Sequence, residues 1–312
     1  MIISTKKLLE KAKEQKFAVG AYNVNNMEIV QGIVEAGKEL NAPLILQVSK
    51  GARDYAGVKY IKKLIEAAEE DSGLPIALHL DHGTTIELCK ECVDDGFTSV
   101  MFDGSHESFE ENVRMTKEVV EYAHAHGVPV EAELGQLVGE QLDSSEGGNK
   151  SEGIYTDPDQ AEEFIKRTGC DFLAVAIGSS HGAYKFKGEP KLDFERLRQI
   201  REKVTIPLVM HAASSVLPEY VEVCNQFGGK IEGSKGVPEE QIQTAVYIGM
   251  QKVNIDTDLR LAMTGAIRRA LWENPKEFDP RKYLGSGRDA IKMAVMQKIK
   301  LLGTDGKASL FT

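Results

Sequence analysis

The sequence predicts an α/β fold in which eight parallel strands alternate with helices and close into one barrel. The first observation is a set of eight short runs that are almost continuously apolar, as strands buried on both faces must be. The second is the helical spacing of apolar residues in the segments between them. The third is the number of alternations, because eight is the number that closes such a barrel.

The predicted strands cover residues 17–23, 43–49, 75–81, 99–105, 129–135, 172–178, 207–213 and 252–257. Four of them are introduced by proline, which is tolerated at the first position of a strand. A doubly wound open sheet is the alternative fold, but no G-x-G-x-x-G follows the first strand and no Walker lysine loop is present. We therefore predict a single TIM-barrel domain over residues 1–312, with an extra C-terminal helix.

Helices are predicted between the strands because several of these segments begin with capping signals. The clearest signals are two capping boxes and one N-cap followed by proline, namely Thr84-x-x-Glu87, Ser108-x-x-Glu111 and Asp157-Pro158. Cys89 and Cys92 fall in the helix that follows the first of these signals. They are interpreted as small core residues, because no second C-x-x-C completes a metal site.

Composition excludes some classes of partner. The formal net charge of −10 argues against nucleic acid and against an anionic membrane surface. No run reaches the roughly 18 apolar residues of a membrane helix. The N-terminal segment lacks the apolar core of a signal peptide, so we expect a cytoplasmic protein.

Three histidines stand at or just beyond the carboxyl ends of predicted strands: His82, His181 and His211. The carboxyl ends of all barrel strands meet at one rim, so these three imidazoles are expected to converge. Three protein nitrogens with a fourth position left open are typical of a catalytic zinc site. A single histidine of this kind is more often structural, and it is the shared position of three that favours a metal.

Acidic side chains and two long connections gather at the same rim. The carboxylates are Asp81, Asp103, Glu131, Glu133, Asp256 and Asp258, more than helix capping requires. The connection 136–156 is polar and rich in glycine, and its length predicts a lid over the site. The segments after the seventh and eighth strands, 211–215 and 254–258, consist of small or polar residues. They are the usual place for a phosphate site in such a barrel.

The motifs LHLDHG, VMFDGSH, VEAELG, AIGSSHGAYK, PLVMHAASS, NIDTDLR and FDPRKYLG occur in one order along residues 17–303. In that combination the sequence resembles the class II, metal-dependent fructose-bisphosphate aldolases. The resemblance implies that His82, His181 and His211 bind a catalytic Zn²⁺, with Asp81 as the proton-transfer acid. It also implies that Asp103 and Glu133 bind a second metal ion or the displaced zinc, and that a monovalent cation can take part.

The resemblance further implies a binding site for a phosphorylated ketose, and a homodimer or homotetramer as the assembly. The residues that match the dihydroxyacetone phosphate site are Gly182, Lys185, Ser214, Asn254, Asp256 and Thr257, with Ala212 beside them and with Asn23 and Ser49 as further substrate contacts. Arg260 and Arg281 are candidates for the second phosphate, and Arg281 is expected to act across a subunit interface.

Two positions depart from the family pattern. The family's lid has glycine followed by paired acids, whereas this chain has Gly139-Glu140-Gln141, so direct alignment places Gln141 where the catalytic base is expected. An amide cannot accept that proton, and a register shift would let Glu140 serve instead. The second departure is Ala212, which replaces a glycine and crowds the backbone with a Cβ.

These features together predict a zinc-dependent lyase that cleaves fructose 1,6-bisphosphate into dihydroxyacetone phosphate and glyceraldehyde 3-phosphate. One alternative is a related substrate, such as tagatose 1,6-bisphosphate or a sulfonated sugar phosphate. Asp256 argues against tagatose, because tagatose enzymes tend to have alanine there. The other alternative is a catalytically impaired homologue that binds phosphosugars, which Gln141 and Ala212 suggest.

Glu140 is predicted to be the base that exchanges the C3 proton of dihydroxyacetone phosphate. Glu140→Gln should slow this exchange by roughly 10²–10⁴-fold, the usual contribution of a positioned base, while zinc binding is unchanged. The exchange is measured by loss of label from C3. If Glu140→Gln has no effect and Gln141→Glu strongly accelerates exchange, direct alignment is right and the chain is a weakened aldolase.

Overall fold

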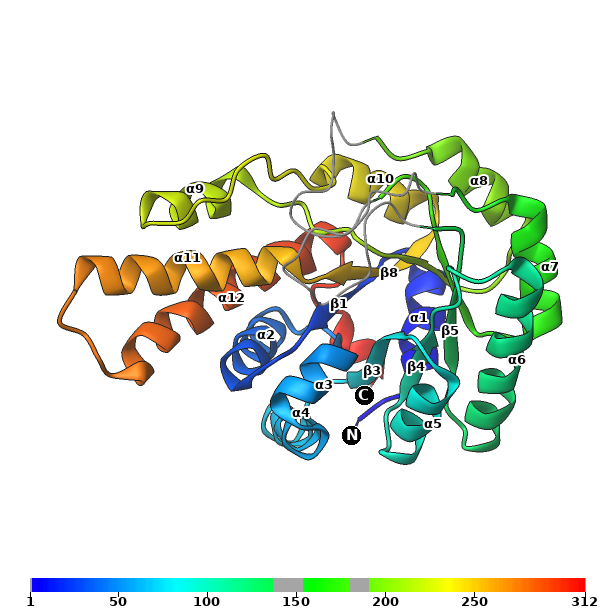
Figure 1. Ribbon diagram of the computed structural model, residues 1–312, viewed down its shortest axis with the longest axis horizontal. Coiled ribbons are helices and arrows are strands. Elements are labelled where there is room, and N and C mark those ends of the chain that lie inside the picture. Colours follow the sequence, from blue (N-terminus) through cyan, green and yellow to red (C-terminus); the bar gives the residue numbers. More distant parts are fainter. Residues whose placement is uncertain (1, 137–153, 180–190, 312) are drawn as a thin grey trace.

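A computed structural model describes residues 2–136, 154–179 and 191–311, and its eight strands form one closed parallel barrel in sequence order (Figure 1). Each strand pairs with the next, and the last pairs with the first through the register Ala21–Asn254. The strands are β1 (Val19–Asn23), β2 (Leu44–Ser49), β3 (Ile76–Gly83), β4 (Ser99–Phe102), β5 (Val130–Leu134), β6 (Phe172–Val175), β7 (Leu208–Met210) and β8 (Met250–Ile255). The predicted fold class is confirmed.

Twelve α-helices lie in the described residues, most of them packed around the outside of the barrel. The helices before β5 are α1 (Thr5–Gln15), α2 (Met27–Leu40), α3 (Lys50–Ala56), α4 (Val58–Ser72), α5 (Ile86–Asp94) and α6 (Phe109–Ala125). The later ones are α7 (Pro158–Thr168), α8 (Phe194–Lys203), α9 (Pro218–Gln226), α10 (Glu239–Ile248), α11 (Thr257–Glu273) and α12 (Pro280–Leu302). A short 3₁₀ helix, η1 (Lys307–Phe311), follows α12.

The strand predictions are right in number and order, but most predicted strands are too long at one end. Residues 103–105, 176–178 and 211–213 leave the ladder because β4, β6 and β7 end before them. The N-cap predicted at Thr84 is wrong. Thr85 adopts the extended backbone of an N-cap, and its hydroxyl accepts a hydrogen bond from the Leu88 amide, so α5 begins one residue later. The caps predicted at Ser108 and Asp157 are confirmed.

Helix α1 closes the amino-terminal end of the barrel. Leu8, Leu9 and Ala12 are fully buried, and they belong to one apolar cluster with residues that the strands point inward. The inward residues of this cluster are Val19, Ala21, Ile45, Ala77, Met101, Phe172, Ala174 and Val209. These apolar side chains pack on one another inside the barrel and on α1 at its lower end.

The period-two alternation of side chains along each strand also points a set of polar residues inward. Gln47, His79, Ser99, Glu131 and Lys252 belong to this set, and all five are fully buried. The next inward positions include Asn23, Asp81, Glu133 and Asn254, at the carboxyl ends of their strands. On β2, β3, β5 and β8 the inward polar side chains therefore continue to the end where sites form in this fold.

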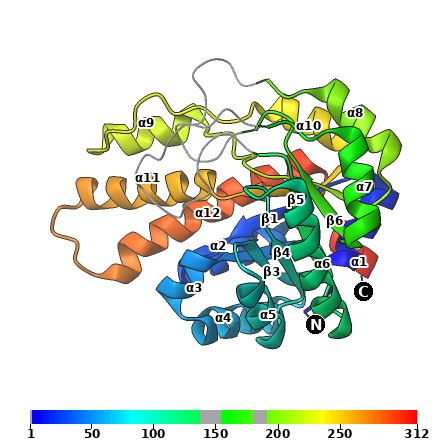
Figure 2. The same ribbon diagram turned by 45° about the vertical axis from the view of Figure 1, so that its right-hand side comes forward.

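The additional C-terminal helix is present. Helices α11 and α12 form a long hairpin that projects to one side of the barrel, and α12 returns along α2 (Figures 1 and 2). Helices α2 and α12 approach closely at Gly32 of α2, where a Cβ atom would lie 2.7 Å from the Arg288 carbonyl oxygen and 2.7 Å from the Ile291 side chain. Within the described ranges, each helix is too short or too polar to span a bilayer.

Gly32→Ala should lower the free energy of unfolding by about 1–3 kcal/mol, the usual cost of overpacking, because the backbone carbonyl it meets cannot move aside. Gly285 in α12 is the matched control, since no atom lies within 4 Å of a Cβ built there. Gly285→Ala should raise stability by up to about 1 kcal/mol through helix propensity. Urea unfolding measures both, and equal effects would contradict the close approach of α2 and α12.

Candidate active site

Most of the predicted site residues that the structure describes gather at the carboxyl-terminal mouth of the barrel. They come from the ends of different strands or directly follow them: Asn23 from β1, Ser49 from β2, Asp81 and His82 from β3, Asp103 after β4, Glu133 from β5, His211 after β7 and Asn254 from β8. Ser49 and Asp81 are register partners on neighbouring strands. The convergence that the strand-end positions predicted is therefore present for two of the three histidines.

Asp81 and His82 are adjacent in sequence, yet both reach the same site. Strict alternation would point His82 to the outside of the barrel. The pairing of β3 with β4 is irregular between Leu80 and Gly83, and His82 has a left-handed backbone with φ of 48°. Bulges next to active sites redirect a side chain in this way. The local departure from the strand gives the site two functional groups from consecutive residues.

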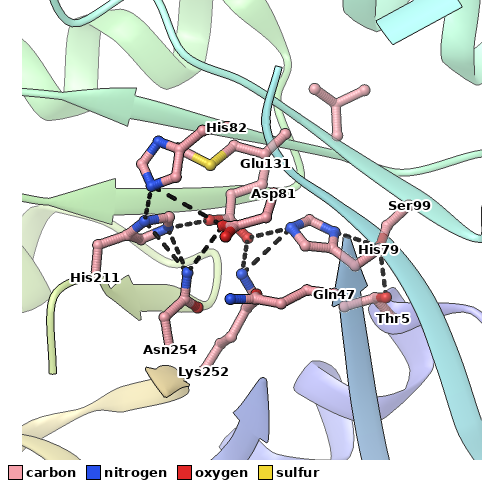
Figure 3. A network of polar contacts seen from close by, with 12 residues as sticks. Thr5, Gln47, His79, Asp81, His82, Ser99, Glu131, His211, Lys252 and Asn254 are labelled. Atoms are coloured by element: carbon pink, nitrogen blue, oxygen red, sulfur yellow. Dashed lines mark hydrogen bonds and ion pairs between the residues drawn. The ribbon is translucent and has the colours of Figure 1, made fainter. Parts of the chain in front are cut away.

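The two imidazoles face each other across the mouth. His82 Nε2 lies 2.9 Å from His211 Nδ1 (Figure 3). The other nitrogen of His82, Nδ1, is 2.7 Å from the Asp103 carboxylate, and the other nitrogen of His211, Nε2, is 2.6 Å from Glu131. An ionised carboxylate only accepts hydrogen bonds, so each outer nitrogen holds a proton, and a neutral ring then has only a lone pair on its inner nitrogen.

Two facing lone pairs repel each other unless a cation lies between them, and this requirement fits a metal. A tetrahedral zinc with bonds of about 2.05 Å holds two nitrogens about 3.3 Å apart, close to the separation found here. Asp81, His82 and His211 each offer one ligand atom, and these atoms all lie within 4.8 Å of one another. His181, the third predicted zinc ligand, lies outside the described residues.

In the metal-free protein a proton satisfies the same requirement. Burial alone would lower the pKa of His82, but the charge of Asp81 and the hydrogen bond to Asp103 outweigh it and raise the pKa to about 10. Burial, together with the neighbouring positive charge of His82, holds the pKa of His211 well below its usual range. His82 is therefore the protonated partner and donates to neutral His211.

Asp81 is held as a carboxylate beside the imidazoles. Burial would raise its pKa, but the charge of His82 and the hydrogen bond from Asn23 lower the pKa below its usual range. The Asn23 amide donates to Asp81 at 2.7 Å, and the Asn254 amide lies 3.3 Å from the other carboxylate oxygen. Gln47 in turn donates to the Asn23 side chain at 2.6 Å. An ionised, oriented carboxylate of this kind can accept a proton from a bound hydroxyl.

A polar network beneath the mouth fixes the orientation of His211. Glu131 forms an ion pair of 2.8 Å with Lys252, and neither side chain is exposed (Figure 3). His79 lies 3.3 Å from the Lys252 ammonium nitrogen and 2.7 Å from the Ser99 hydroxyl. The Ser99 hydroxyl is 2.6 Å from that of Thr5 in α1. The chain of contacts thus runs from the candidate metal ligand to the base of the barrel.

In the sequence, Glu131 stands out only as an acidic residue of the rim, and no role is predicted for Lys252. The signal was nevertheless present. Lys252 is a lysine within an apolar strand, on the same face as Asn254 by period-two spacing, and a fully buried lysine requires a buried acid. Glu131, also inward-facing, is that acid. His79 is a satisfied core histidine, and burial keeps its pKa well below the usual range.

A second cluster of possible ligands shares His82. His82, Asp103 and Glu133 each offer an atom within 4.8 Å of the others. Within the described ranges, neither carboxylate oxygen of Glu133 has a hydrogen-bond partner. Burial and the charge of Asp103 raise the pKa of Glu133 well above its usual range. A buried carboxyl group with a raised pKa holds its proton, and a cation must replace that proton in order to bind. Glu133 therefore suits a cation that binds only transiently.

The loop after β7 lies against the start of α11. Ser214 is buried, and its hydroxyl accepts a hydrogen bond of 3.2 Å from the Asp256 amide. Thr257 is the first residue of α11, so these groups stand at a helix amino terminus, where anions are favoured. Ala212 has φ of 54°, which explains why glycine suits this position.

The two predicted arginines lie in different surroundings. Arg260 is in the first turn of α11 and pairs with Asp256 at 2.8 Å, close to the mouth. Arg281 begins α12 at the far end of the hairpin, where it pairs with Asp279 and is almost fully exposed. Helix α11 is about 25 Å long, so a single chain does not bring Arg281 to this site. Its action across a subunit interface stays a prediction.

Several predicted residues cannot be placed. Glu140, Gln141, Gly182 and Lys185, like His181, fall in the two connections that lie outside the described residues. Most of the predicted lid, 136–156, lies outside the described residues as well. The described residues on either side of this gap are close together, because the backbones of Gln136 and Ile154 form an antiparallel bridge.

Comparison with known proteins gives a consistent result. The family model described as fructose-bisphosphate aldolase class-II matches residues 3–307. The chain is 50% identical over 310 residues to the fructose-bisphosphate aldolase of Giardia intestinalis, a match that covers 98% of this chain and 94% of that protein. It is 47% identical to the fructose-bisphosphate aldolase of Thermus caldophilus, covering 99% and 100%. The crystal structure of the YdjI aldolase of Escherichia coli K12 matches with a TM-score of 0.79 at 32% identity, covering 99% and 100%.

Zinc binding to the metal-free protein should release about one proton per ion at pH 8, because His82 is protonated there and a ligand imidazole must be neutral. Zinc affinity should accordingly increase with pH below the His82 pKa of about 10. Calorimetric titration in buffers of different ionisation enthalpy measures the protons released. The exposed His124 provides the control, since His124→Gln should leave the release unchanged. Zinc binding without proton release would contradict the pairing described for His82.

Proposed function

The chain belongs to the class-II fructose-bisphosphate aldolase family, and we propose that it is a zinc-dependent lyase acting on fructose 1,6-bisphosphate. The products are dihydroxyacetone phosphate and glyceraldehyde 3-phosphate, and the reverse condensation uses the same groups. The observation on which the proposal mainly rests is the ionised Asp81 beside two imidazoles whose inner nitrogens face each other. That arrangement supplies both a cation site and a proton acceptor at one point of the barrel mouth.

His82 and His211 are the proposed zinc ligands, with His181 as the third. Neutral imidazoles leave the double charge of the ion undiminished, and a bound zinc stabilises the electron pair that bond cleavage leaves on the substrate. The protein's own contribution is orientation. Asp103 holds the ring of His82 and Glu131 holds that of His211. Such partners of metal ligands typically change metal affinity 10–100-fold.

Asp81 is the proposed proton acceptor in cleavage. It takes the proton of the C4 hydroxyl, the oxygen electrons form the C4 carbonyl, and the C3–C4 bond breaks with its electron pair left on C3. C3 then receives a proton from the lid, for which Glu140 is the proposed donor. The amides of Asn23 and Asn254 keep the Asp81 carboxylate oriented throughout. In condensation Asp81 returns its proton to the new hydroxyl.

The phosphate of the dihydroxyacetone half is proposed to bind between the loop after β7 and the start of α11. The Ser214 oxygen already accepts the Asp256 amide, so the hydroxyl hydrogen can be donated to a phosphate oxygen. The amino terminus of α11 at Thr257 adds favourable partial charge. Gly182 and Lys185 are proposed to complete this site, and Arg260 to bind the second phosphate.

A second cation and an oligomer belong to the same proposal. His82, Asp103 and Glu133 would hold a second metal ion or the displaced zinc. A homodimer or homotetramer is supported by the apolar side chains that the α11–α12 hairpin exposes near its tip: Leu271, Trp272 and Phe278. Arg281 lies beside this surface, where a partner subunit could receive it.

Asp81→Asn should reduce kcat for fructose 1,6-bisphosphate cleavage by roughly 10²–10⁴-fold, because the amide cannot accept the C4 proton. A coupled assay for triose phosphates measures the loss. Proton exchange at C3 of dihydroxyacetone phosphate does not involve C4, so it should remain close to the wild-type rate. If cleavage and exchange fall together at full zinc occupancy, Asp81 has a different role. If the unaltered protein releases no triose phosphates, the proposed activity is wrong.

A further inference from the structure

The loop from Ala212 to Val216 has a backbone that its residues do not favour. Ala212 and Val216 both lie in the left-handed region, with φ of 54° and 50°. A β-branched residue is rarely found there, and such a conformation persists only when the surrounding structure enforces it. Some contact must therefore hold this loop in place.

The side chain of Asp258 makes that contact. Its carboxylate accepts hydrogen bonds from the Ser215 amide at 2.9 Å and from the Val216 amide at 2.7 Å. Asp258 lies in the first turn of α11 and is fully buried. Both amides belong to the half of the loop that ends at Val216, so the position of this carboxylate determines the backbone there.

A buried carboxylate requires compensation, and Lys298 provides it from α12. The Lys298 ammonium nitrogen is 3.1 Å from Asp258, 2.8 Å from the Ser215 hydroxyl and 2.9 Å from Glu239. Only 1% of Lys298 is exposed. An unpaired carboxylate at this depth would be strongly unfavourable. The additional helix α12 thus delivers a positive charge to a loop at the barrel mouth.

The opposite side of the loop is fixed by backbone packing. The Val237 amide donates to the Ser214 carbonyl at 3.2 Å. Gly236 lies so close to the loop that a Cβ atom there would be 2.2 Å from the backbone carbonyl oxygen of Ser214. With Asp258 and Lys298 on one side and this segment on the other, the loop is clamped in one conformation.

We propose that Lys298 and Asp258 are positioning residues that hold the loop 212–216 in the conformation that binds the substrate phosphate. The inference rests on the phosphate site proposed above. In the chain, Ala212 and Ser214 lie between His211 and the Ser215 and Val216 amides that Asp258 holds. Movement of Ser215 and Val216 would therefore displace Ala212 and Ser214 from the substrate phosphate. Neither Lys298 nor Asp258 needs to touch substrate for this effect. Their loss should weaken the binding of the phosphate group while the metal ligands and Asp81 remain in place.

The test compares Lys298→Met with Lys292→Met in the zinc-loaded protein. Lys292 is also in α12 and pairs with Glu39, but it lies away from the loop. Lys298→Met should raise KM for fructose 1,6-bisphosphate and the inhibition constant of inorganic phosphate by about tenfold or more. Its kcat should stay within about threefold, and its zinc content should be unchanged. Lys292→Met should match the wild type in all four measurements.

A rescue variant tests the physical cause. Glycine adopts positive φ without strain, so Val216→Gly in the Lys298→Met background should recover much of the lost phosphate binding. If Lys298→Met does not fold, the neutral pair Asp258→Asn/Lys298→Met removes the uncompensated charge and takes its place, with the same expectation.

The outcomes separate this inference from the proposed function. A lower melting temperature with unchanged KM and unchanged phosphate inhibition would assign Lys298 a purely structural role and overturn the inference. An equal loss of kcat and zinc would overturn it as well. A wild-type protein that neither cleaves the bisphosphate nor is inhibited by phosphate would instead refute the proposed function.

Discussion

The ion pair between Glu131 and Lys252 lies in the centre of the barrel, where solvent reaches neither side chain. Each charge would be prohibitively unfavourable alone, so the two are confined to one geometry. That geometry leaves the second oxygen of Glu131 directed at His211, which fixes the ring and its tautomer. The inner nitrogen of His211 then faces His82, and the position of a cation follows. The candidate metal site is in this sense a consequence of how the barrel neutralises its buried charge.

The layers of the barrel explain why this charge lies where it does. Helix α1 closes the lower end with apolar side chains, so the interior there is an ordinary core. On β2, β3, β5 and β8 the inward polar side chains continue to the carboxyl ends of the strands. His79 and Ser99 connect the ion pair to Thr5 of α1 by hydrogen bonds. The interior polar groups therefore form one connected network, which favours a single well-defined arrangement.

A second buried lysine, Lys298, forms an ion pair with a buried carboxylate outside the barrel. Like Lys252, it is a buried lysine that stabilises a buried carboxylate, and in both cases the carboxylate orients a functional element. Glu131 orients a histidine ring, whereas Asp258 orients a loop through two backbone amides. The first acts on the candidate metal site and the second on the proposed phosphate site. Helix α12, which a minimal eight-stranded barrel does not require, carries the lysine of this second pair.

The sequence alone determined the features that depend on periodicity and order along the chain. Eight apolar runs separated by helical patterns indicate a parallel sheet covered on both faces, and their number favours closure into the barrel that the structure shows. Because parallel strands place their carboxyl ends together, the gathering of Asp81, His82, His211 and Asn254 also followed from sequence. Helix caps were predictable only to within a residue, as Thr85 demonstrates, because neighbouring hydroxyls compete for the same role.

Only the tertiary structure decided how these groups face one another. The inward turn of His82 depends on a β-bulge and a left-handed residue, which break the alternation that sequence patterns assume. The pairing of Lys252 with Glu131, and of Lys298 with Asp258, joins residues 121 and 40 positions apart in sequence. Their partners are fixed by strand register and helix docking, and no local pattern records either. Sequence therefore specified which groups reach the mouth, and long-range packing specified their orientation and charge.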